Sequence, residues 1–559
     1  MRNKILYLGL SVIILLSAKT NLFSQHNAPK VYTYADTVRG SILPERAWWN
    51  VLRYDLTIKP DFENKNISGK NIIQYNVLNE NNPHIMQIDL QEPMNIDSII
   101  LNSSKKLDFK RNGNAYYSDV PGQELNSDNS VTVFFHGKPH ESTFPPWDAG
   151  FVWKKDSLGN PWMSAACQGG GASVWYPCKD HQSDEPDNGA SLTMIVPDDL
   201  TAVANGRLNS KIINEDGTVS YKWEVVNPIN NYNIIPYVGK YVNISDIYNG
   251  EKGALNIELW VLEYNTERAR EHILPEVKRM LEAFEHWFGP YPFYEDSYKI
   301  IDAPYPGMEH QSGIAYGNRY LFGYWGKDRS QTGWGMKFDY MIVHESAHEW
   351  FGNSITSNDI ADMWIHEAFG DYSEALFIEY WYNKDAAIEY NNGLRKSISN
   401  KTPITGNYGV NSEGSSDMYP KGSNMLNSIR HSIDNDEKFR EILRGMNNTF
   451  YHKTVDAKEI EDYISDKAGF DYSKVFDQYL KTIQIPVFEY NFSKDGKKVN
   501  FRYTNCIEGF NLPLALDSGG IKIKIFPSTE WSSMEIMPSG AALFNTELIE
   551  KMYYIKVNG

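Results

Sequence analysis

The residues best suited to chemistry are two histidines and a glutamate in the segment MIVHESAHEWFG. His344 and His348 are four positions apart, so in a helix both imidazoles lie on one face and can chelate one zinc ion. Glu345 projects about 100° away from them, where its carboxylate can reach a water molecule rather than the metal. The alternative is an ordinary amphipathic helix that carries two histidines. The spacing indicates a candidate zinc hydrolase centre.

A catalytic zinc ion takes three protein ligands and keeps one open position, so a third ligand must come from elsewhere. The next helical stretch, DIADMWIHEAFGDYSEALFIEYW, offers Glu367, which eighteen intervening residues separate from His348, and the weaker candidate His366. Asp371 and Glu374 lie on the same predicted helix face as Glu367. Either of these two accepts a hydrogen bond from a metal-bound imidazole, or both form a solvated acidic stripe.

These residues must be positioned by three regions whose sequence patterns differ. Residues 26–252 contain short β-branched runs such as SVTVFFHG and SLTMIVP, which predict an antiparallel β domain. Residues 253–484 contain helical patterns, beginning with ILPEVKRMLEAFEHWFG, and include the zinc motif. Residues 485–559 return to strand patterns in VFEYNF, KVNFRYT, IKIKIF and MYYIKV. We therefore expect a multidomain α and β protein with a mainly helical catalytic domain and a small C-terminal β-sandwich.

The first 25 residues have the pattern of a signal peptide. Arg2 and Lys4 precede a largely apolar run from Ile5 to Ala18, which is too short to span a membrane as a helix. No other segment is long and apolar enough to span. We expect a cleaved leader and an exported protein, either periplasmic or secreted.

Composition excludes several classes of protein. The 559 residues include 54 Lys and Arg against 71 Asp and Glu, a net charge of −17. Nucleic-acid binding needs basic patches, so we expect no nucleic-acid partner. Three cysteines in a chain of this length exclude a disulfide scaffold, and Cys167 and Cys178 either pair or remain free thiols.

Four motifs, in this order along the chain, resemble those of peptidase family M1, the aminopeptidase N and leukotriene hydrolase family. CQGGGASVWYPCKDH resembles its glutamine-containing strand, and APYPGMEHQSGIAYG its exopeptidase loop. HESAHEWFG and WIHEAFGDYSE match its zinc signature, and MYPKGSNML resembles the segment of its catalytic tyrosine. The resemblance extends from about Arg53 to Thr482 and implies a thermolysin-like catalytic domain.

The resemblance also implies roles for individual residues. His344, His348 and Glu367 would hold one catalytic zinc ion. Glu345 would act as the general base, and Tyr419 would donate a hydrogen bond to the developing oxyanion. The protein would then be a zinc aminopeptidase.

Other matched residues concern the substrate, which would be a peptide with a free N-terminus. Glu309 would hold the α-ammonium group, assisted by Gln168. Gly307 and Met308 would let the substrate approach as an extended strand. These contacts distinguish an aminopeptidase from an endopeptidase, because they place the first peptide bond at the metal.

Two departures from the family pattern are visible. His310 stands where the family has asparagine, so it either keeps a polar role or reshapes the first side-chain pocket. The C-terminal region is too short for the helical cap of longer relatives, so we expect a more open site that accepts longer peptides. The alternatives are a zinc endopeptidase of the same type and a non-catalytic peptide-binding protein.

Overall fold

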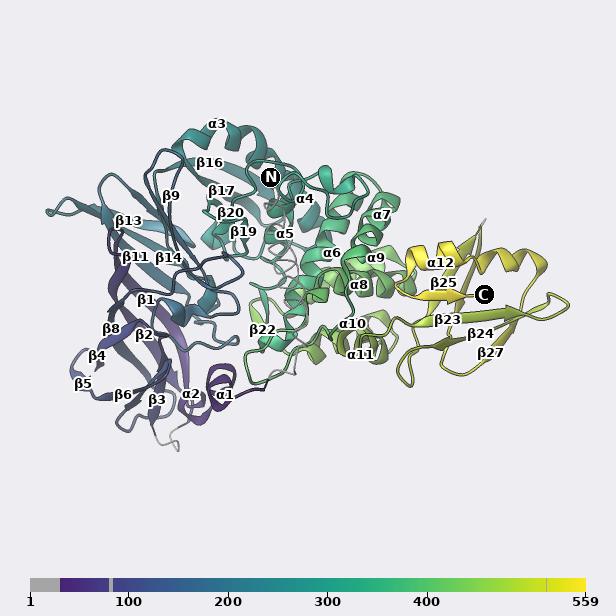
Figure 1. The fold of residues 1–559 in the computed structure, drawn as a ribbon, viewed down its shortest axis with the longest axis horizontal. Coiled ribbons are helices and arrows are strands. Elements are labelled where there is room, and N and C mark those ends of the chain that lie inside the picture. The colour runs from purple at the N-terminus through teal and green to yellow at the C-terminus, as the bar shows by residue number, and fades with distance from the viewer. Residues whose placement is uncertain (1–30, 80–83, 519) are drawn as a thin grey trace, which may run out of the picture.

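The computed structural model describes residues 31–79, 84–518 and 520–559, which form three units along one long axis (Figure 1). The first unit consists mainly of strands, the second mainly of helices, and the third is a smaller unit rich in strands. This arrangement confirms the predicted fold class. The predicted leader, residues 1–25, lies outside the described residues. Within the described ranges, no helix is long and apolar enough to cross a membrane.

The N-terminal unit is built on an eight-stranded sheet of order β13-β14-β11-β1-β2-β8-β4-β5. Burial alternates along its longest strand, β1 (Trp49–Asp61), as expected for a sheet with one face on the core. All neighbouring strands are antiparallel except β1 and β11, which are parallel. The other strands are β2 (Asn66–Val77), β4 (Asn95–Leu101), β5 (Lys105–Leu107), β8 (Asp128–Gly137), β11 (Ala190–Pro197), β13 (Arg207–Ile213) and β14 (Thr218–Val225).

Two smaller sheets and two short helices complete this unit. The four-stranded sheet has the order β12-β15-β10-β9, and the three-stranded sheet has the order β3-β7-β6. Their bounds, with those of the helices, are α1 (Tyr34–Gly40), α2 (Pro44–Ala47), β3 (Ile85–Asp89), β6 (Phe109–Asn112), β7 (Ala115–Asp119), β9 (Gly150–Lys155), β10 (Pro161–Ala166), β12 (Thr201–Val203) and β15 (Tyr237–Gly239). Strand β10 leads directly into Gln168, which places this sheet beside the site. Cys167 and Cys178 are buried free thiols.

The second unit begins with a five-stranded sheet of order β16-β17-β18-β20-β19. Strands β16 (Tyr241–Gly250) and β17 (Gly253–Leu262) form a hairpin, so the expected domain boundary at residue 252 falls inside its turn. The pattern of β16 resembles that of the preceding strands, and only its pairing partner assigns it to the second unit. The remaining strands are β18 (Tyr298–Asp302), β19 (Gly307–Met308) and β20 (Ile314–Tyr316).

Helices make up most of the second unit. The apolar stripe predicted around residues 273–287 is buried in α4 (Leu274–Phe288), including Val277, Leu281 and Phe284. The helices of the site are α5 (Tyr340–Ala347), α6 (Trp364–Trp381) and α8 (Pro420–Ile433). The others, with the parallel strand pair between them, are α3 (Thr266–Arg268), α7 (Lys384–Leu394), α9 (Asp436–Thr449), α10 (Ala457–Ala468), α11 (Ser473–Lys481), β21 (Ile355–Ser357) and β22 (Lys453–Val455).

The C-terminal unit has a four-stranded sheet of order β27-β24-β23-β28 and a two-stranded ribbon of β25 and β26. Helix α12 (Thr546–Met552) ends at the first residue of MYYIKV, a run that the sequence predicted as a strand; only its last two residues belong to a strand, β28 (Lys556–Asn558). Asn427 of α8 donates a hydrogen bond to the carbonyl of Met552 (3.1 Å), so the unit docks on the helices. The other strands are β23 (Val487–Phe492), β24 (Lys498–Thr504), β25 (Leu514–Ser518), β26 (Ile521–Ile525) and β27 (Ser532–Glu535).

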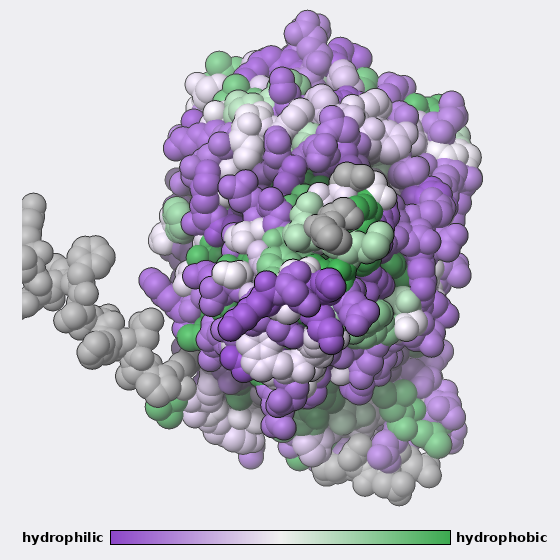
Figure 2. All heavy atoms as spheres, turned by 90° about the vertical axis from the view of Figure 1, so that its right-hand side faces the viewer, coloured by the Kyte–Doolittle hydropathy of each residue, from purple (hydrophilic) through white to green (hydrophobic). Residues whose placement is uncertain are grey.

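Seen from the C-terminal end, the surface is mostly hydrophilic, with hydrophobic residues gathered near the middle of the view (Figure 2). The exposed apolar side chains of the C-terminal unit include Phe526, Trp531 and Met537. This unit lies on the opposite side of the helices from the N-terminal β unit (Figure 1).

Candidate active site

The zinc motif lies on α5, whose eight residues are all buried. Asp339 caps its N-terminus, because its carboxylate accepts hydrogen bonds from the backbone N–H groups of Met341 (3.0 Å) and Ile342 (3.4 Å). The helical conformation continues to His348, so the two predicted imidazoles are one turn apart on the same face, with their ring centroids 5.1 Å apart. Local sequence therefore positions the first two ligands.

Helix α6 supplies the third ligand. Glu367 Oε2 lies 3.4 Å from His348 Nε2 and 3.7 Å from His344 Nε2. Two atoms bound to a tetrahedral zinc ion at about 2.0–2.1 Å are about 3.3–3.4 Å apart. Glu367 Oε2 is buried and accepts no hydrogen bond from the described residues. A buried carboxylate oxygen without a partner is costly, and a metal ion would satisfy it.

The electrostatics of this cluster also favour a cation. Although burial opposes it, Glu367 raises the pKa of His348 to about 9. The carboxylates of Glu367 and Glu374 likewise raise the pKa of His344. The three residues together favour a positive charge between them, and their donor set of two imidazoles and one carboxylate fits zinc.

The outer nitrogen of each imidazole is engaged. His344 Nδ1 donates a hydrogen bond to Glu374 Oε1 (2.8 Å), and His348 Nδ1 donates to the carbonyl of Phe351 (3.0 Å). Both contacts leave Nε2 as the free electron-pair donor, directed at Glu367. Glu374 therefore has the supporting role that the sequence left open between it and Asp371.

Asp371 has a different partner. Arg329 Nη1 lies 3.1 Å from Asp371 Oδ1 and 3.4 Å from Glu374 Oε1, and both carboxylates are fully buried. The alternative of a solvated acidic stripe is wrong, since neither residue reaches solvent. The two carboxylates also cluster with His344, but the guanidinium group of Arg329 already pairs with both of them, so this group is a poor second metal site.

His366 lies outside the ligand cluster. Its Nε2 accepts a hydrogen bond from the backbone N–H of Ser357 (3.0 Å), and burial lowers its pKa to about 3. Neighbouring positions on a helix point about 100° apart, so His366 faces the backbone of β21 when Glu367 faces the imidazoles. This excludes the weaker ligand alternative.

A glycine on α6 is part of the site, although the sequence analysis did not identify it. A Cβ atom on Gly370 would lie 3.1 Å from His348 Cε1 and 3.5 Å from His344 Cε1. Gly370 is one turn beyond Glu367, so it faces the same imidazoles. The two imidazole rings occupy the space that a side chain at position 370 would need.

Glu309 follows the edge strand β19 and is buried. Its Oε1 accepts hydrogen bonds from Gln168 Nε2 (2.6 Å) and from the hydroxyl of Tyr232 (3.1 Å). Burial, together with the carboxylates of Glu367 and Glu345, raises the pKa of Glu309 to about 7, although His348 opposes this. Nothing in the sequence marked Tyr232 among the 36 tyrosines.

The zinc helix and the Glu309 segment are tied together. Asn353, just beyond α5, donates a hydrogen bond to the carbonyl of Glu309 (2.8 Å). A Cβ atom on Gly307 would lie 2.6 Å from Met341 Sδ and 2.9 Å from Glu345 Oε1. Gly307 therefore packs directly on Glu345, and a side chain there would displace that carboxylate.

Tyr419 lies at the N-terminus of α8, where Pro420 starts the helix. Its ring stacks near His344, with the centroids 6.0 Å apart and the planes at 25°. A Cβ atom on Gly422 would be 2.5 Å from Ala368 Cβ, so this glycine allows α8 to approach α6. Burial and the carboxylates of Glu367 and Glu309 raise the pKa of Tyr419, which keeps its phenol protonated.

The predicted site residues line one cleft of about 940 Å³ between the first two units. The N-terminal unit contributes Trp147 and residues 168–170, and the helical unit contributes the zinc ligands, Glu345, residues 411–414 and Tyr419. None of the described residues after Tyr419 lines this cleft, so the C-terminal unit does not cover it. His310 does not line it either. His310 is buried, and its Nδ1 lies 2.5 Å from the hydroxyl of Tyr237.

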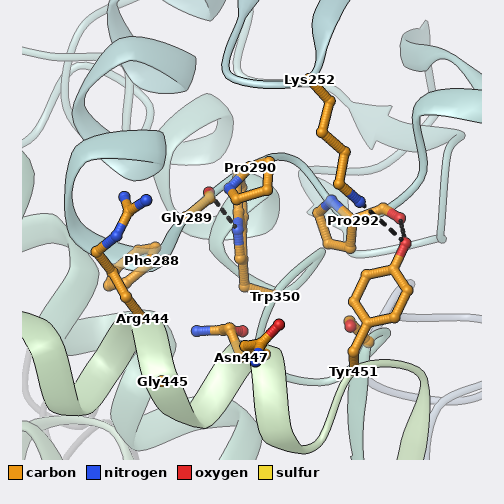
Figure 3. Close-up of a pocket in the computed structure, with 12 residues that line it drawn as sticks. Lys252, Phe288, Gly289, Pro290, Pro292, Trp350, Arg444, Gly445, Asn447 and Tyr451 are labelled. Carbon is orange, nitrogen blue, oxygen red and sulfur yellow. Dashed lines mark hydrogen bonds between the residues drawn. The ribbon is translucent and has the colours of Figure 1, made fainter.

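A second cavity, of about 580 Å³, lies between the end of α4, α9 and the β16–β17 turn (Figure 3). In it, Trp350 donates a hydrogen bond to the carbonyl of Gly289 (3.1 Å), and Lys252 Nζ lies 3.5 Å from the Tyr451 hydroxyl. None of the predicted site residues lines this cavity. The cleft with the zinc ligands is therefore the candidate active site.

Several known proteins are similar to this chain. The family model for the peptidase family M1 domain matches residues 273–479. Endoplasmic reticulum aminopeptidase 1 of Rattus norvegicus is 22% identical over 297 residues, which are 51% of this chain and 31% of that protein. Mitochondrial aminopeptidase 2 of Saccharomyces cerevisiae is 24% identical over 494 residues, 81% of this chain and 48% of that protein. The matches therefore span less than half the length of these relatives.

The fold also has a counterpart among solved structures. The crystal structure of an M1 zinc metallopeptidase from Deinococcus radiodurans superposes with a TM-score of 0.65 at 18% sequence identity. The match covers 78% of this chain and 94% of that one. The likeness establishes a shared fold over the part of the chain that the match covers.

Proposed function

Residues 273–479 are a peptidase family M1 domain, and on this premise we propose that the protein is a zinc-dependent aminopeptidase. The observation that carries the proposal is a single cleft that contains a three-ligand metal cluster, an adjacent carboxylate and a buried carboxylate for an amine. The first two support hydrolysis, and the third supports selection of a free N-terminus.

Recognition of the N-terminus would depend on Glu309. The residue is 2% exposed. One oxygen of its carboxylate accepts hydrogen bonds from Gln168 and from Tyr232. An α-ammonium group would pair with this buried carboxylate and stabilise its ionised form. A blocked N-terminus would leave the charge buried without an opposite charge beside it, which is unfavourable. The site would therefore reject acylated peptides.

The substrate backbone would lie along β19. This two-residue strand is at the edge of its sheet, so one side of it has free N–H and C=O groups. A peptide paired there as an added strand, with its amine at Glu309, has its first carbonyl directed toward the ligand cluster. That register would restrict cleavage to the first peptide bond.

Three groups would share the chemistry. Zinc held by His344, His348 and Glu367 supplies Lewis acidity, which polarises a carbonyl group and makes a water molecule more acidic. Glu345, beside the two imidazoles, would take the proton from the attacking water and pass it to the leaving amine. The phenol of Tyr419 forms no hydrogen bond with the described residues, so it is free to donate one to the oxyanion of the substrate.

The test uses the zinc-loaded protein and one short peptide, with a free and with an acetylated N-terminus, followed by mass spectrometry. We expect stepwise loss of N-terminal residues from the free peptide alone, and no cleavage after chelation. Glu345→Gln should abolish cleavage, while Glu309→Gln should reduce the preference for the free peptide. Internal cleavage of both peptides at equal rates would favour a zinc endopeptidase. Absence of any cleavage by zinc-loaded protein would favour a peptide-binding protein.

A further inference from the structure

Three consecutive glycines, Gly169, Gly170 and Gly171, follow Gln168 and form a turn at the cleft. Gly169 and Gly171 have positive φ angles of 73° and 91°, and the turn has little stiffness of its own because glycine has no Cβ atom. Gln168 nevertheless has to be held closely, since its Nε2 donates the 2.6 Å hydrogen bond to Glu309, the proposed anchor of the substrate amine. The turn must therefore be fixed by its neighbours.

Two side chains from other segments bind the carbonyl groups of this glycine turn. Gln91 Nε2 donates a hydrogen bond to the carbonyl of Gly170 (2.7 Å), and Asn411 Nδ2 donates one to the carbonyl of Gly169 (3.0 Å). Gln91 belongs to the same β unit, whereas Asn411 lies in a loop of the helical unit that also lines the cleft. The Asn411 contact therefore joins the two units of the cleft at the residue next to Gln168.

The third glycine of the turn is in contact with an arginine of helix α1. This residue, Arg39, belongs to the segment of residues 34–41, which we call the arm. Its guanidinium group lies 3.2 Å from Asp180 Oδ1 and also donates a hydrogen bond to the carbonyl of Asp180. A Cβ atom on Gly171 would overlap both Arg39 Nη2 and Asp180 Oδ2. The ion pair therefore lies directly against the turn, three residues from Gln168.

The arm also holds the loop that contains Asn411. Ser41 Oγ donates a hydrogen bond to the carbonyl of Gly409 (2.7 Å). Gly40 packs on the same loop, since a Cβ atom on Gly40 would overlap the backbone nitrogen of Asn411. The arm therefore reaches the glycine turn by two routes, directly through the guanidinium group of α1 and indirectly through Asn411.

Two routes that converge on one flexible turn indicate a function for the arm. We propose that the arm holds Gln168 against Glu309, which makes Arg39 a positioning residue for the recognition of the substrate amine. The inference rests on the proposed aminopeptidase function and assigns to that site a supporting element from outside the cleft. Arg39 does not line the cleft, so it acts through Gln168 and not on the substrate itself.

The test is a double-mutant cycle on the zinc-loaded enzyme, with alanine p-nitroanilide as the substrate. The amine is held in the ground state and in the transition state alike, so a weaker anchor should raise KM and leave kcat within about twofold. Gln168→Ala should raise KM by about tenfold, because it removes a hydrogen bond to a charged group. Arg39→Gln should raise KM by about fivefold when Gln168 is present and by less than about 1.5-fold in Gln168→Ala, where there is no amide to position.

Arg502→Gln is the matched control. It removes the same charge and one ion pair, 2.9 Å long to Glu489, from the C-terminal unit, whose described residues do not line the cleft. It should leave KM unchanged. A second variant of the arm, Ser41→Ala, removes only the hydrogen bond to Gly409 and should raise KM by about two- to threefold, again only while Gln168 is present. This second cycle decides the question if Arg39→Gln fails to fold.

The outcomes separate the assignment from the function on which it rests. A change in KM that is the same with and without Gln168, or no change in KM in either arm variant, would overturn the assignment and leave the aminopeptidase function intact. It would show that the arm only stabilises the fold, which the thermal unfolding midpoint of each variant would record. Absence of p-nitroaniline release by the zinc-loaded wild type would refute the proposed function and the assignment together.

Discussion

Replacement of Gly370 by alanine tests whether the packing of α6 sets the position of the two imidazoles. The added Cβ atom would lie 3.1 Å from His348 Cε1, 3.3 Å from His348 Nε2 and 3.5 Å from His344 Cε1. Carbon atoms in ordinary contact are about 3.5–4.0 Å apart, so the His348 ring must move by about 0.4 Å or more. Metal–ligand distances tolerate only about 0.2 Å.

We therefore expect Gly370→Ala to lose about 10- to 100-fold in zinc affinity, the range typical of lost support around a metal site. This corresponds to about 1.4–2.7 kcal/mol. The same change should leave the metal-free protein at least as stable as the wild type, because alanine is favoured over glycine inside a helix by about 0.8–1 kcal/mol. Opposite effects on the two quantities distinguish a displaced ligand from a general folding defect.

The assay has two measurements. Zinc affinity is obtained by competition with a chromogenic chelator, and the stability of the metal-free protein by urea unfolding. Gly122→Ala is the matched control, because a Cβ atom there has its closest contact at 3.9 Å. A zinc affinity of Gly370→Ala within about threefold of the wild type would refute the packing argument.

The other predictions concern hydrogen bonds and one buried acid. Glu374→Gln should weaken zinc binding by about 10- to 100-fold, because an amide orients the His344 imidazole less strongly than a carboxylate; unchanged affinity in the same competition assay would contradict this. Tyr419→Phe should lower kcat by about 10²- to 10³-fold with little change in KM, and a loss in KM alone would contradict the oxyanion role. Burial raises the pKa of Glu185 to about 7, so its contribution to stability is complete below pH 4.5 and is lost as the pH rises through 7. Glu185→Gln should remove this loss, at most about 3 kcal/mol at pH 8, as measured by urea unfolding at pH 5 and pH 8; identical pH dependence in both proteins would refute it.

The short-range part of the site could be predicted from the sequence because helical geometry relates neighbouring residues. Four positions correspond to about one turn, so the presence of His344 and His348 on one face follows from the spacing alone. The same periodicity predicted the buried stripe of α4. Adjacent positions diverge by about 100°, so only one of His366 and Glu367 can face the imidazoles. The choice between these two residues depended on the resemblance to a family, because the periodicity of one helix does not indicate where α5 lies relative to it.

Only the tertiary structure decided the contacts between elements. The sequence placed Asp371 and Glu374 on one face but could not tell that Glu374 would bind His344 and Asp371 would bind Arg329. Arg329 lies in a loop with no distinguishing pattern. The assignment of β16 to the second unit likewise depended on its pairing with β17 rather than on its own composition.

Gly370 shows the physical reason for this division. Its position one turn after Glu367 is visible in the sequence, but its importance comes from two rings on another helix that occupy the volume of the missing side chain. Spacing within a helix is set by the backbone hydrogen bonds of that helix, which are local. Proximity between helices is set by the packing of all the side chains between them, and no single segment of the chain determines it.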